Sequence, residues 1–202
     1  MQRGVIVSIQ GYHYMTISEL AREAINASCV GIRTDKHITL DNEHRVPIIG
    51  LKKVKVSDAK TEAYITPTIA DVDEVTPWSD MVAIDYRACN KNLAAVSKHC
   101  RERKLTVVAD IERYEDYQNM VDHGYYYEYV TTTFTVLRLL FRPNLRLLEK
   151  LAKVEKRVIA EGNYASRKDV KSAFECGAYA VCIGAAISNV YKLTKKYTSI
   201  PI

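Results

Sequence analysis

The chain has 202 residues, of which 48% are hydrophobic and 26% are charged, and it carries a formal net charge of +5. This composition excludes a disordered chain, and the length suits a single domain over residues 1–202, because no Gly-, Pro- or Ser-rich linker divides the sequence. No run approaches the roughly 20 apolar residues that cross a bilayer, so we expect no membrane partner.

The N-terminal sequence and the cysteines indicate the compartment. The first apolar run, Val5–Ile9, is shorter than the ~7–15 residues of a signal-peptide core. The cysteines form an odd set without a CxxC pair, which is typical of reduced, buried thiols in a cytoplasmic protein: Cys29, Cys89, Cys100, Cys176 and Cys182. Basic residues are scattered among acidic ones, which predicts a solvated surface or a preference for small anions and no nucleic-acid partner.

Short apolar runs rich in Val and Ile recur along the chain and predict buried parallel strands. They are Val5–Ile9, Cys29–Ile32, Pro47–Leu51, Met81–Ile84, Leu105–Ala109, Tyr127–Val130, Arg157–Ala160 and Tyr179–Ile183. Segments between them have helical spacing and predict helices over Thr16–Ala27, Thr68–Val75, Asn90–Arg103, Asn144–Val154 and Ser166–Cys176.

Capping signals support these helices. Thr16 with Glu19, and Ser166 with Asp169, match the capping box, and Gly124 and Gly177 are suited to left-handed positions just after helices. Two segments break the regular order. The stretch 34–46 has room for only a short helix, and 64–67 adds a short extended piece.

This alternation of strands and helices predicts an α/β fold, a short (β/α)8 TIM barrel. The chain is close to the lower limit of roughly 200 residues for this fold. Active sites of such barrels lie at the carboxyl ends of the strands. The residues expected there are Gln10, Arg33, Lys52, Lys53, Asp85, Arg87, Asp110, Thr131–Thr133, Glu161 and Gly184.

The last two strand-to-helix turns are candidates for a phosphate site. Gly162-Asn163 and Gly184-Ala185-Ala186 place small or flexible residues where backbone N–H groups can approach an anion. The alternative reading is that both glycines serve turn geometry alone.

Other known motifs are absent from the sequence. The five histidines show neither HExxH nor zinc-type spacing, and there is no GxGxxG, P-loop or GxSxG motif. We therefore expect no metal site and no nucleotide cofactor.

Several segments in order along the chain resemble the N-acylglucosamine-6-phosphate 2-epimerase (N-acetylmannosamine-6-phosphate epimerase) family. They are VSIQ (7–10), VGIRT (30–34), VPIIGLKK (46–53), YITPT (64–68), VAID (82–85), VADIE (108–112), VIAEGN (158–163) and AYAVCIGAAI (178–187). The resemblance implies an isomerase of amino sugar and sialic acid catabolism that interconverts N-acetylmannosamine 6-phosphate and N-acetylglucosamine 6-phosphate without a cofactor.

The resemblance also implies roles for individual residues. Lys53, and not Lys52, occupies the position of the family's catalytic lysine, and Glu161 that of its acid. The positions of the substrate-binding residues are occupied by Gln10, Arg33 and Asp110. Together with the apolar segment 190–202, the resemblance implies a possible homodimer.

The implied chemistry needs these residue types. Removing a proton next to a carbonyl creates an enediolate, which requires a base, an acid and a fixed positive charge. A lysine beside Arg33 and away from water can have its pKa lowered enough to act as the base. Glu161 can be the partner acid or can pass a proton to the sugar oxygen.

Two positions depart from the family pattern at the phosphate end. Asn163 and Asn189 stand where family members commonly have cations, so Arg87, Arg167 or Lys168 would have to compensate. Two other readings stay open: a different phosphosugar isomerase or epimerase with the same Lys/Glu pair, and a barrel that binds a sugar phosphate without turnover.

Overall fold

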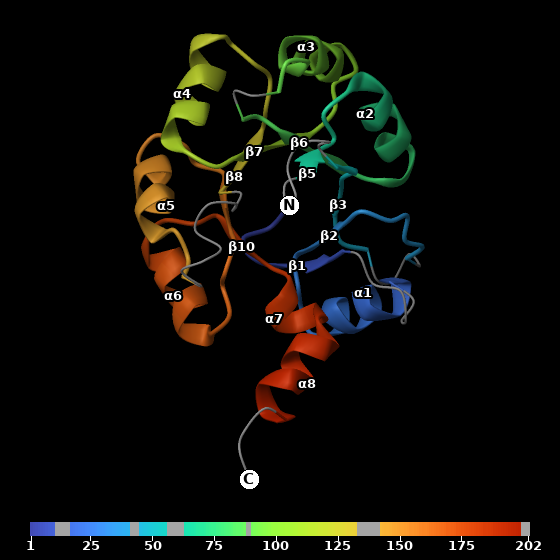
Figure 1. Cartoon of the computed structure of the whole chain (residues 1–202), viewed down its shortest axis with the longest axis vertical. Helices are drawn as coiled ribbons and strands as arrows, with labels where there is room; N and C mark the ends of the chain where they lie inside the picture. The colour runs from blue at the N-terminus through green and yellow to red at the C-terminus, as the bar shows by residue number, and fades with distance from the viewer. Residues whose placement is uncertain (11–16, 41–44, 56–62, 88–89, 133–141, 199–202) are drawn as a thin grey trace.

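A computed structural model describes residues 1–10, 17–40, 45–55, 63–87, 90–132 and 142–198 of the chain. Eight parallel strands close into a barrel in the order β1-β10-β9-β8-β7-β6-β3-β2, which confirms the predicted fold (Figure 1). They are β1 (Gly4–Ile9), β2 (Gly31–Thr34), β3 (Ile48–Gly50), β6 (Met81–Asp85), β7 (Val107–Ile111), β8 (Tyr129–Thr132), β9 (Val158–Glu161) and β10 (Ala180–Ile183).

Several strands extend beyond the apolar runs that predicted them. The second was expected at Cys29–Ile32 and spans Gly31–Thr34, and the fifth was expected at Leu105–Ala109 and spans Val107–Ile111. Backbone pairing, not side-chain polarity, sets where a strand ends. Arg33 and Asp110 therefore lie within strands.

Helices surround the barrel. They are α1 (Ile17–Asn26), α2 (Ile69–Val75), α3 (Leu93–Glu102), α4 (Tyr114–Asp122), α5 (Leu145–Ala152) and α6 (Arg167–Glu175), with a short 3-10 turn η2 (Thr76–Trp78) after α2. The Ser166–Asp169 capping box is confirmed at the start of α6. Gly124 and Gly177 have the expected positive φ values, 61° and 94°. Thr16 lies outside the described residues.

The link between β2 and β3 is the segment with room for only a short helix. Residues 35–40 and 45–47, the part of this link that the structure describes, contain no helix. Ile38 is buried and packs with Leu40 and Val46 against the outer side of the sheet. Apolar side chains on an extended segment thus cover β1 and β2 where a helix would otherwise lie.

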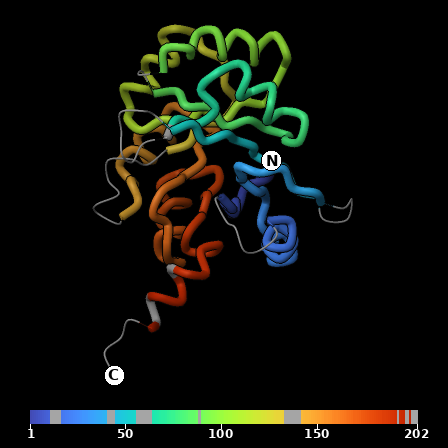
Figure 2. Tube along the Cα trace, turned by 45° about the vertical axis from the view of Figure 1, so that its right-hand side comes forward, coloured from blue at the N-terminus to red at the C-terminus, as the bar shows by residue number. Residues whose placement is uncertain are grey.

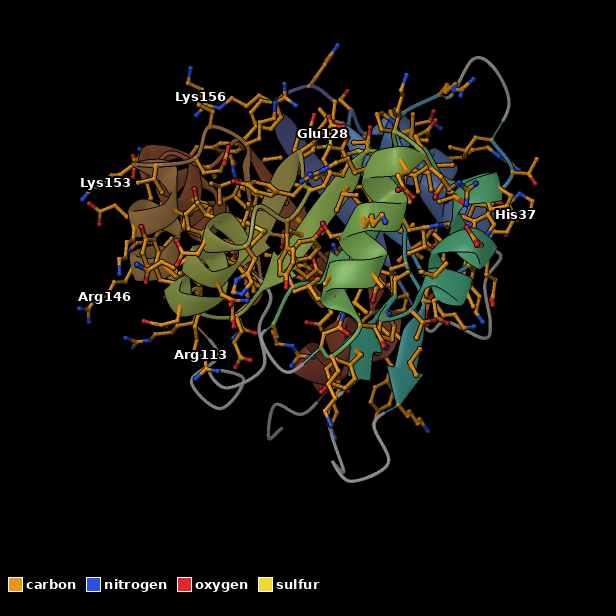
Figure 3. All side chains as sticks on the ribbon, turned by 90° about the horizontal axis from the view of Figure 1, so that it is seen from above. His37, Arg113, Glu128, Arg146, Lys153 and Lys156 are labelled. Atoms are coloured by element: carbon orange, nitrogen blue, oxygen red, sulfur yellow. The ribbon has the colours of Figure 1, made fainter. Side chains whose placement is uncertain are left out.

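The predicted extended piece at 64–67 takes part in a hairpin next to the barrel. Strand β4 (Lys53–Lys55) pairs antiparallel with β5 (Ala63–Ile65), and Lys52 and Thr66 exchange hydrogen bonds at its base. This corrects one placement, because Lys53 does not directly follow a barrel strand but begins the hairpin. Figure 3 shows the hairpin at the same end of the barrel as Arg113, which follows β7, and opposite Glu128, which precedes β8.

We call the end of the barrel at the carboxyl ends of its strands the mouth. Alternating residues on each strand face inward, and the interior below the mouth is filled by apolar side chains that include Ile6, Ile49, Met81, Val108 and Ile159. The same alternation carries inward-facing positions up to the mouth. The polar residues at these positions include Ser8, Arg33, Asp85, Asp110, Thr131 and Glu161.

The C-terminal helix α8 does not pack around the barrel as the helices between the strands do. After β10 the chain forms α7 (Ala185–Ser188) and α8 (Val190–Thr198), and α8 points away from the barrel (Figures 1 and 2). In the described part of the chain, no helix has the length and apolar character needed to span a membrane.

Candidate active site

Arg33 reaches from β2 to carboxylates at the ends of β7 and β9. Its Nη2 donates to Asp110 Oδ2 over 2.6 Å and its Nη1 to Asp110 Oδ1 over 3.2 Å. Nη1 also lies 3.4 Å from Glu161 Oε2. The side chains of Arg33 and Asp110 are buried, whereas Glu161 keeps 22% of its side chain exposed. One guanidinium is therefore shared between a buried and a partly open carboxylate.

Two threonines of β8 hold Glu161 in place. Thr131 Oγ1 donates to Glu161 Oε2 over 3.0 Å. The Thr132 hydroxyl bonds both backbone groups of Glu161, accepting from its N–H and donating to its C=O, each over 2.9 Å. From the sequence these threonines were identified only as a strand end. Their role depends on β8 lying between β7 and β9.

Burial and neighbouring charges set the proton affinities of this cluster. Burial raises the pKa of Asp110 to about 7; Arg33 opposes the shift, and the charge of Glu161 adds to it. Burial disfavours the Arg33 cation, but Asp110 and Glu161 more than compensate, so the pKa of Arg33 is raised. The mouth thus contains a permanent cation beside a carboxyl group that titrates near neutral pH.

The two adjacent lysines have different surroundings. Lys52 Nζ binds Glu74 at 2.6 Å and Asp71 at 3.0 Å, both on α2 outside the barrel. Leu51 is buried in the barrel interior, and alternation along an extended segment predicts that Lys53 points to the side of Leu51, opposite to Lys52. Lys53 is exposed, so the shelter from water expected for a lysine base is absent in this structure.

The barrel strands that precede Lys53 and carry Glu161 lie on opposite sides of the barrel. Lys53 comes three residues after β3, and Glu161 ends β9. In the closed barrel β3 and β9 are four places apart in either direction. The two groups can therefore approach a bound molecule from opposite faces.

Gln10 is the remaining predicted substrate-binding residue. It directly follows β1, and its Nε2 donates to Ser8 Oγ over 2.7 Å. Both residues have the inward orientation of Ile6, so Gln10 lies at the mouth.

A second ion-pair cluster occupies the mouth beside β6. Arg87 binds Asp85 through Nε (3.0 Å) and Nη2 (2.6 Å), and its Nη1 lies 3.8 Å from Glu112 Oε2. The Tyr64 ring of β5 lies against the guanidinium, with 5.3 Å from Cζ to the ring centroid. The sequence placed Arg87 at the mouth but did not single out Glu112 or Tyr64.

The described residues contain no group of three or more His, Cys, Asp or Glu side chains placed to hold a metal ion. Their cysteines, Cys29, Cys100, Cys176 and Cys182, are free thiols.

Comparison with known proteins assigns the family. The NanE family, described as "Putative N-acetylmannosamine-6-phosphate epimerase", matches residues 17–200. The chain belongs to this epimerase family. Two relatives named "Putative N-acetylmannosamine-6-phosphate 2-epimerase" are similar to it. The one from Clostridioides difficile (strain 630) is 31% identical, covering 90% of this chain and 85% of its own length. The one from Caldanaerobacter subterraneus subsp. tengcongensis is 30% identical, covering 98% and 91%.

Solved structures agree with this assignment. The N-acetylmannosamine-6-phosphate 2-epimerase from Clostridium perfringens has a TM-score of 0.80 to this chain at 26% identity, covering 98% of this chain and 93% of that one. A 3-hexulose-6-phosphate synthase from Salmonella typhimurium has a TM-score of 0.65 at 11% identity, covering 94% and 92%, and shares the fold.

In this member of the epimerase family, the two turns predicted for phosphate follow neighbouring strands. Glu161 of β9 is in register with Cys182 of β10, and Gly162-Asn163 and Gly184-Ala185 come directly after. Gly162 and Asn163 have φ values of 99° and 59°, so this turn is tight and left-handed. The two turns therefore follow adjacent strands at the mouth.

The candidate compensating cations fall into two groups. Arg87 follows β6 and forms an ion pair with Asp85. In the strand order of the barrel, β6 is four strands away from β10 and therefore on the opposite side. It therefore does not supply charge at these turns. Arg167 and Lys168 open α6 directly after the β9 turn and are exposed. Of the three cations considered, Arg167 and Lys168 follow the turn after β9, whereas Arg87 follows β6.

Proposed function

We propose that this epimerase interconverts N-acetylmannosamine 6-phosphate and N-acetylglucosamine 6-phosphate in the catabolism of amino sugars and sialic acid. The proposal is supported by the strand order, in which β3, which leads to Lys53, is opposite β9, which ends at Glu161, and by the Arg33 cation beside Glu161. Inversion at C2 requires a proton to leave one face of the carbon and to return on the other. Two proton-transfer groups on opposite walls meet that requirement.

The reaction proceeds on the open-chain sugar, in which C1 is a carbonyl. Neutral Lys53 takes the C2 proton on its Nζ, the C–H electron pair forms the C1–C2 double bond, and the carbonyl oxygen becomes an enolate oxygen. Protonated Glu161 then delivers a proton to the opposite face of C2, and the carbonyl forms again. The bound substrate covers the exposed Lys53 and provides the dry surroundings that lower the pKa of a lysine.

Arg33 stabilises the negative charge on the oxygen. Its Nη atoms are engaged by Asp110, but its buried Nε has no hydrogen-bond partner among the described residues. This N–H is a fixed donor for the enolate oxygen, and a positioned donor of this kind is an effective stabiliser of developing charge. Asp110 orients Arg33, and Asp110 and Gln10 bind substrate hydroxyl groups.

The phosphate binds at the turns Gly162-Asn163 and Gly184-Ala185. Support comes from their position after neighbouring strands and from backbone amides that small residues leave accessible. Exposed Arg167 or Lys168 adds the positive charge. Crystals soaked in sulfate or phosphate test this site, and an anion found only elsewhere on the mouth would contradict it.

Incorporation of deuterium from solvent tests the reaction itself. In D2O, N-acetylmannosamine 6-phosphate should gain deuterium at C2 while N-acetylglucosamine 6-phosphate appears, which can be followed by proton NMR. Isomerisation to a ketose instead would indicate a different phosphosugar isomerase. Binding without exchange would indicate a barrel that binds its ligand without turnover.

The protein acts as a homodimer in the cytoplasm. Ile187, Val190 and Tyr191 are exposed on α7 and α8, and a groove of about 790 Å³ beside them is lined by residues that include Val170 and Phe174 of α6. A second copy would cover this apolar surface. Light scattering should give twice the chain mass, and Val190→Glu combined with Tyr191→Glu should give monomers. The free, mostly buried thiols suit a reducing compartment.

A further inference from the structure

Glu112 is a buried carboxylate with an unsatisfied oxygen at the mouth. Its side chain is 13% exposed, and its Oε1 is buried without a hydrogen-bond partner among the residues that the structure describes. Its other oxygen, Oε2, lies 3.8 Å from Arg87 Nη1, a charge interaction that is too long for a hydrogen bond. Buried acceptors are nearly always satisfied in folded proteins, so Oε1 requires a partner that binds from outside.

The surroundings place a cation beside Glu112 and hold its backbone in position. Arg87 is fixed by Asp85 through a bidentate pair, so a cation remains next to the carboxylate. The Glu112 backbone N–H donates to Asp116 Oδ2 over 3.2 Å, which anchors this end of β7 to α4. An ionised carboxylate accepts hydrogen bonds and donates none. The missing partner is therefore a donor.

The position of Glu112 relates it to the reacting carbon. It comes two residues after Asp110, just beyond the end of β7, and its carboxylate lies beside Arg87, which binds Asp85 at the mouth. Asp110 binds Arg33, which lies beside Glu161. A substituent on a carbon held between Lys53 and Glu161 can therefore extend toward Glu112.

The Tyr64 ring distinguishes between the possible donors. It lies against the Arg87 guanidinium, the same cation that interacts with the Glu112 carboxylate, so the ring and the carboxylate share Arg87 as a neighbour. An acylamino group offers an N–H to the acceptor and an apolar acyl methyl group to the ring. A hydroxyl group offers a donor but gains nothing from an aromatic surface.

We infer that Glu112, supported by Arg87 and Tyr64, is the residue that recognises the acylamino group on C2, with Glu112 Oε1 accepting its amide N–H. The inference rests on the proposed function and deepens it by assigning the selectivity for N-acylated sugars. No atom of this subsite takes part in proton transfer.

Two unreactive ligands test the assignment. N-acetylglucosaminitol 6-phosphate and glucitol 6-phosphate both lack the C1 carbonyl, and they differ only in the C2 substituent. Their dissociation constants can be measured by calorimetry for the wild type, Glu112→Ala and Glu112→Gln. Glu115→Ala serves as the matched control, because Glu115 is an exposed glutamate on the adjacent turn of α4.

Glu112→Ala should weaken binding of the N-acetylated ligand by about 10- to 100-fold, the effect of one hydrogen bond to a charged group, and leave glucitol 6-phosphate within about twofold. Glu112→Gln keeps an acceptor oxygen and should weaken the N-acetylated ligand by only a few-fold. It also provides the test if the alanine variant does not fold. Glu115→Ala should change neither ligand.

Equal weakening of both ligands by Glu112→Ala or Glu112→Gln, or no weakening of either, would overturn the assignment. A wild-type protein that binds neither alditol phosphate would instead contradict the proposed function, and the inference would fail with it. Exchange of deuterium at C2 by the wild type, together with unchanged selectivity in the variants, would contradict only the role of Glu112.

Discussion

Arg33 and Asp110, 77 positions apart in the chain, form a bidentate ion pair at the barrel mouth, with N–O distances of 3.2 and 2.6 Å. The pair joins β2 to β7 across the closed sheet. It also fixes the cation that lies 3.4 Å from Glu161. The Arg33–Asp110 ion pair should therefore matter both for the stability of the barrel and for the proposed reaction.

Arg33→Met should destabilise the fold, because it leaves the buried Asp110 carboxylate without its cation. Loss of one partner of a buried pair costs about 3–5 kcal/mol of unfolding free energy. Urea unfolding at pH 8 measures it. Arg45→Met, which breaks the exposed Arg45–Asp80 pair, is the control and should cost less than about 1 kcal/mol. Similar losses for the two variants would contradict the structural role of Arg33.

Stability should depend on pH through Asp110. The pKa of Asp110 is raised from 3.8 to about 7 on folding, so the native state binds this proton more tightly than the unfolded state. The resulting stabilisation is complete below about pH 4 and is lost as the pH rises through about 7. The unfolding free energy of the wild type minus that of Asp110→Asn should therefore fall between these pH values. A difference that rises with pH would show that the pair with Arg33 outweighs burial.

The adjacent lysines offer a matched test of catalysis. Lys53→Met should reduce turnover and C2 deuterium exchange by about 10²–10⁴-fold, because the proposed base is removed while the barrel strands are untouched. Lys52→Met should keep turnover, since the Lys52 ammonium is bound to Asp71 and Glu74 on α2. Glu161→Gln should reduce turnover by a similar factor, because it removes the proposed acid. The opposite result, with Lys52 essential and Lys53 dispensable, would reverse the assignment.

A cation introduced after α7 should strengthen substrate binding. Asn189 ends α7, close to the turn proposed for phosphate. Asn189→Arg should lower the Michaelis constant by about 10- to 100-fold, the effect of one charge-assisted contact, and added salt should reduce the gain. If Arg167 or Lys168 already supplies this charge, Asn189→Arg changes little, and Arg167→Ala or Lys168→Ala weakens binding instead. No effect from any of the three would count against a phosphorylated substrate.

Close packing between β3 and α2 depends on Gly50. A Cβ atom at this position would lie 2.6 Å from Val75 Cγ1 and 2.7 Å from Ser79 Cβ. Gly50→Ala should therefore lower the unfolding free energy by about 1–3 kcal/mol through overpacking. Because the added methyl group would face Val75 of α2, outside the barrel, the rate of C2 exchange per folded molecule should be unchanged. An unaltered unfolding midpoint would show that the helix moves to accommodate the methyl group.

Local patterns in the sequence were sufficient to predict the barrel, its strands and the polar residues at its mouth. Hydrophobic periodicity and capping residues act over a few positions, so each strand and helix can be recognised from its own segment. The inward orientation of Arg33, Asp110 and Glu161 follows from the same alternation.

Contacts between distant segments were decided only by the tertiary structure. The partner of Arg33 depends on barrel closure, the hairpin position of Lys53 on pairing with 63–65, and the surroundings of Glu112 on β6 and β5 meeting β7. Periodicity along one segment carries no information about which distant segment it meets. The orientation of α8 away from the barrel, and the absence of a helix from residues 35–40 and 45–47 between β2 and β3, depend in the same way on packing that no single segment encodes.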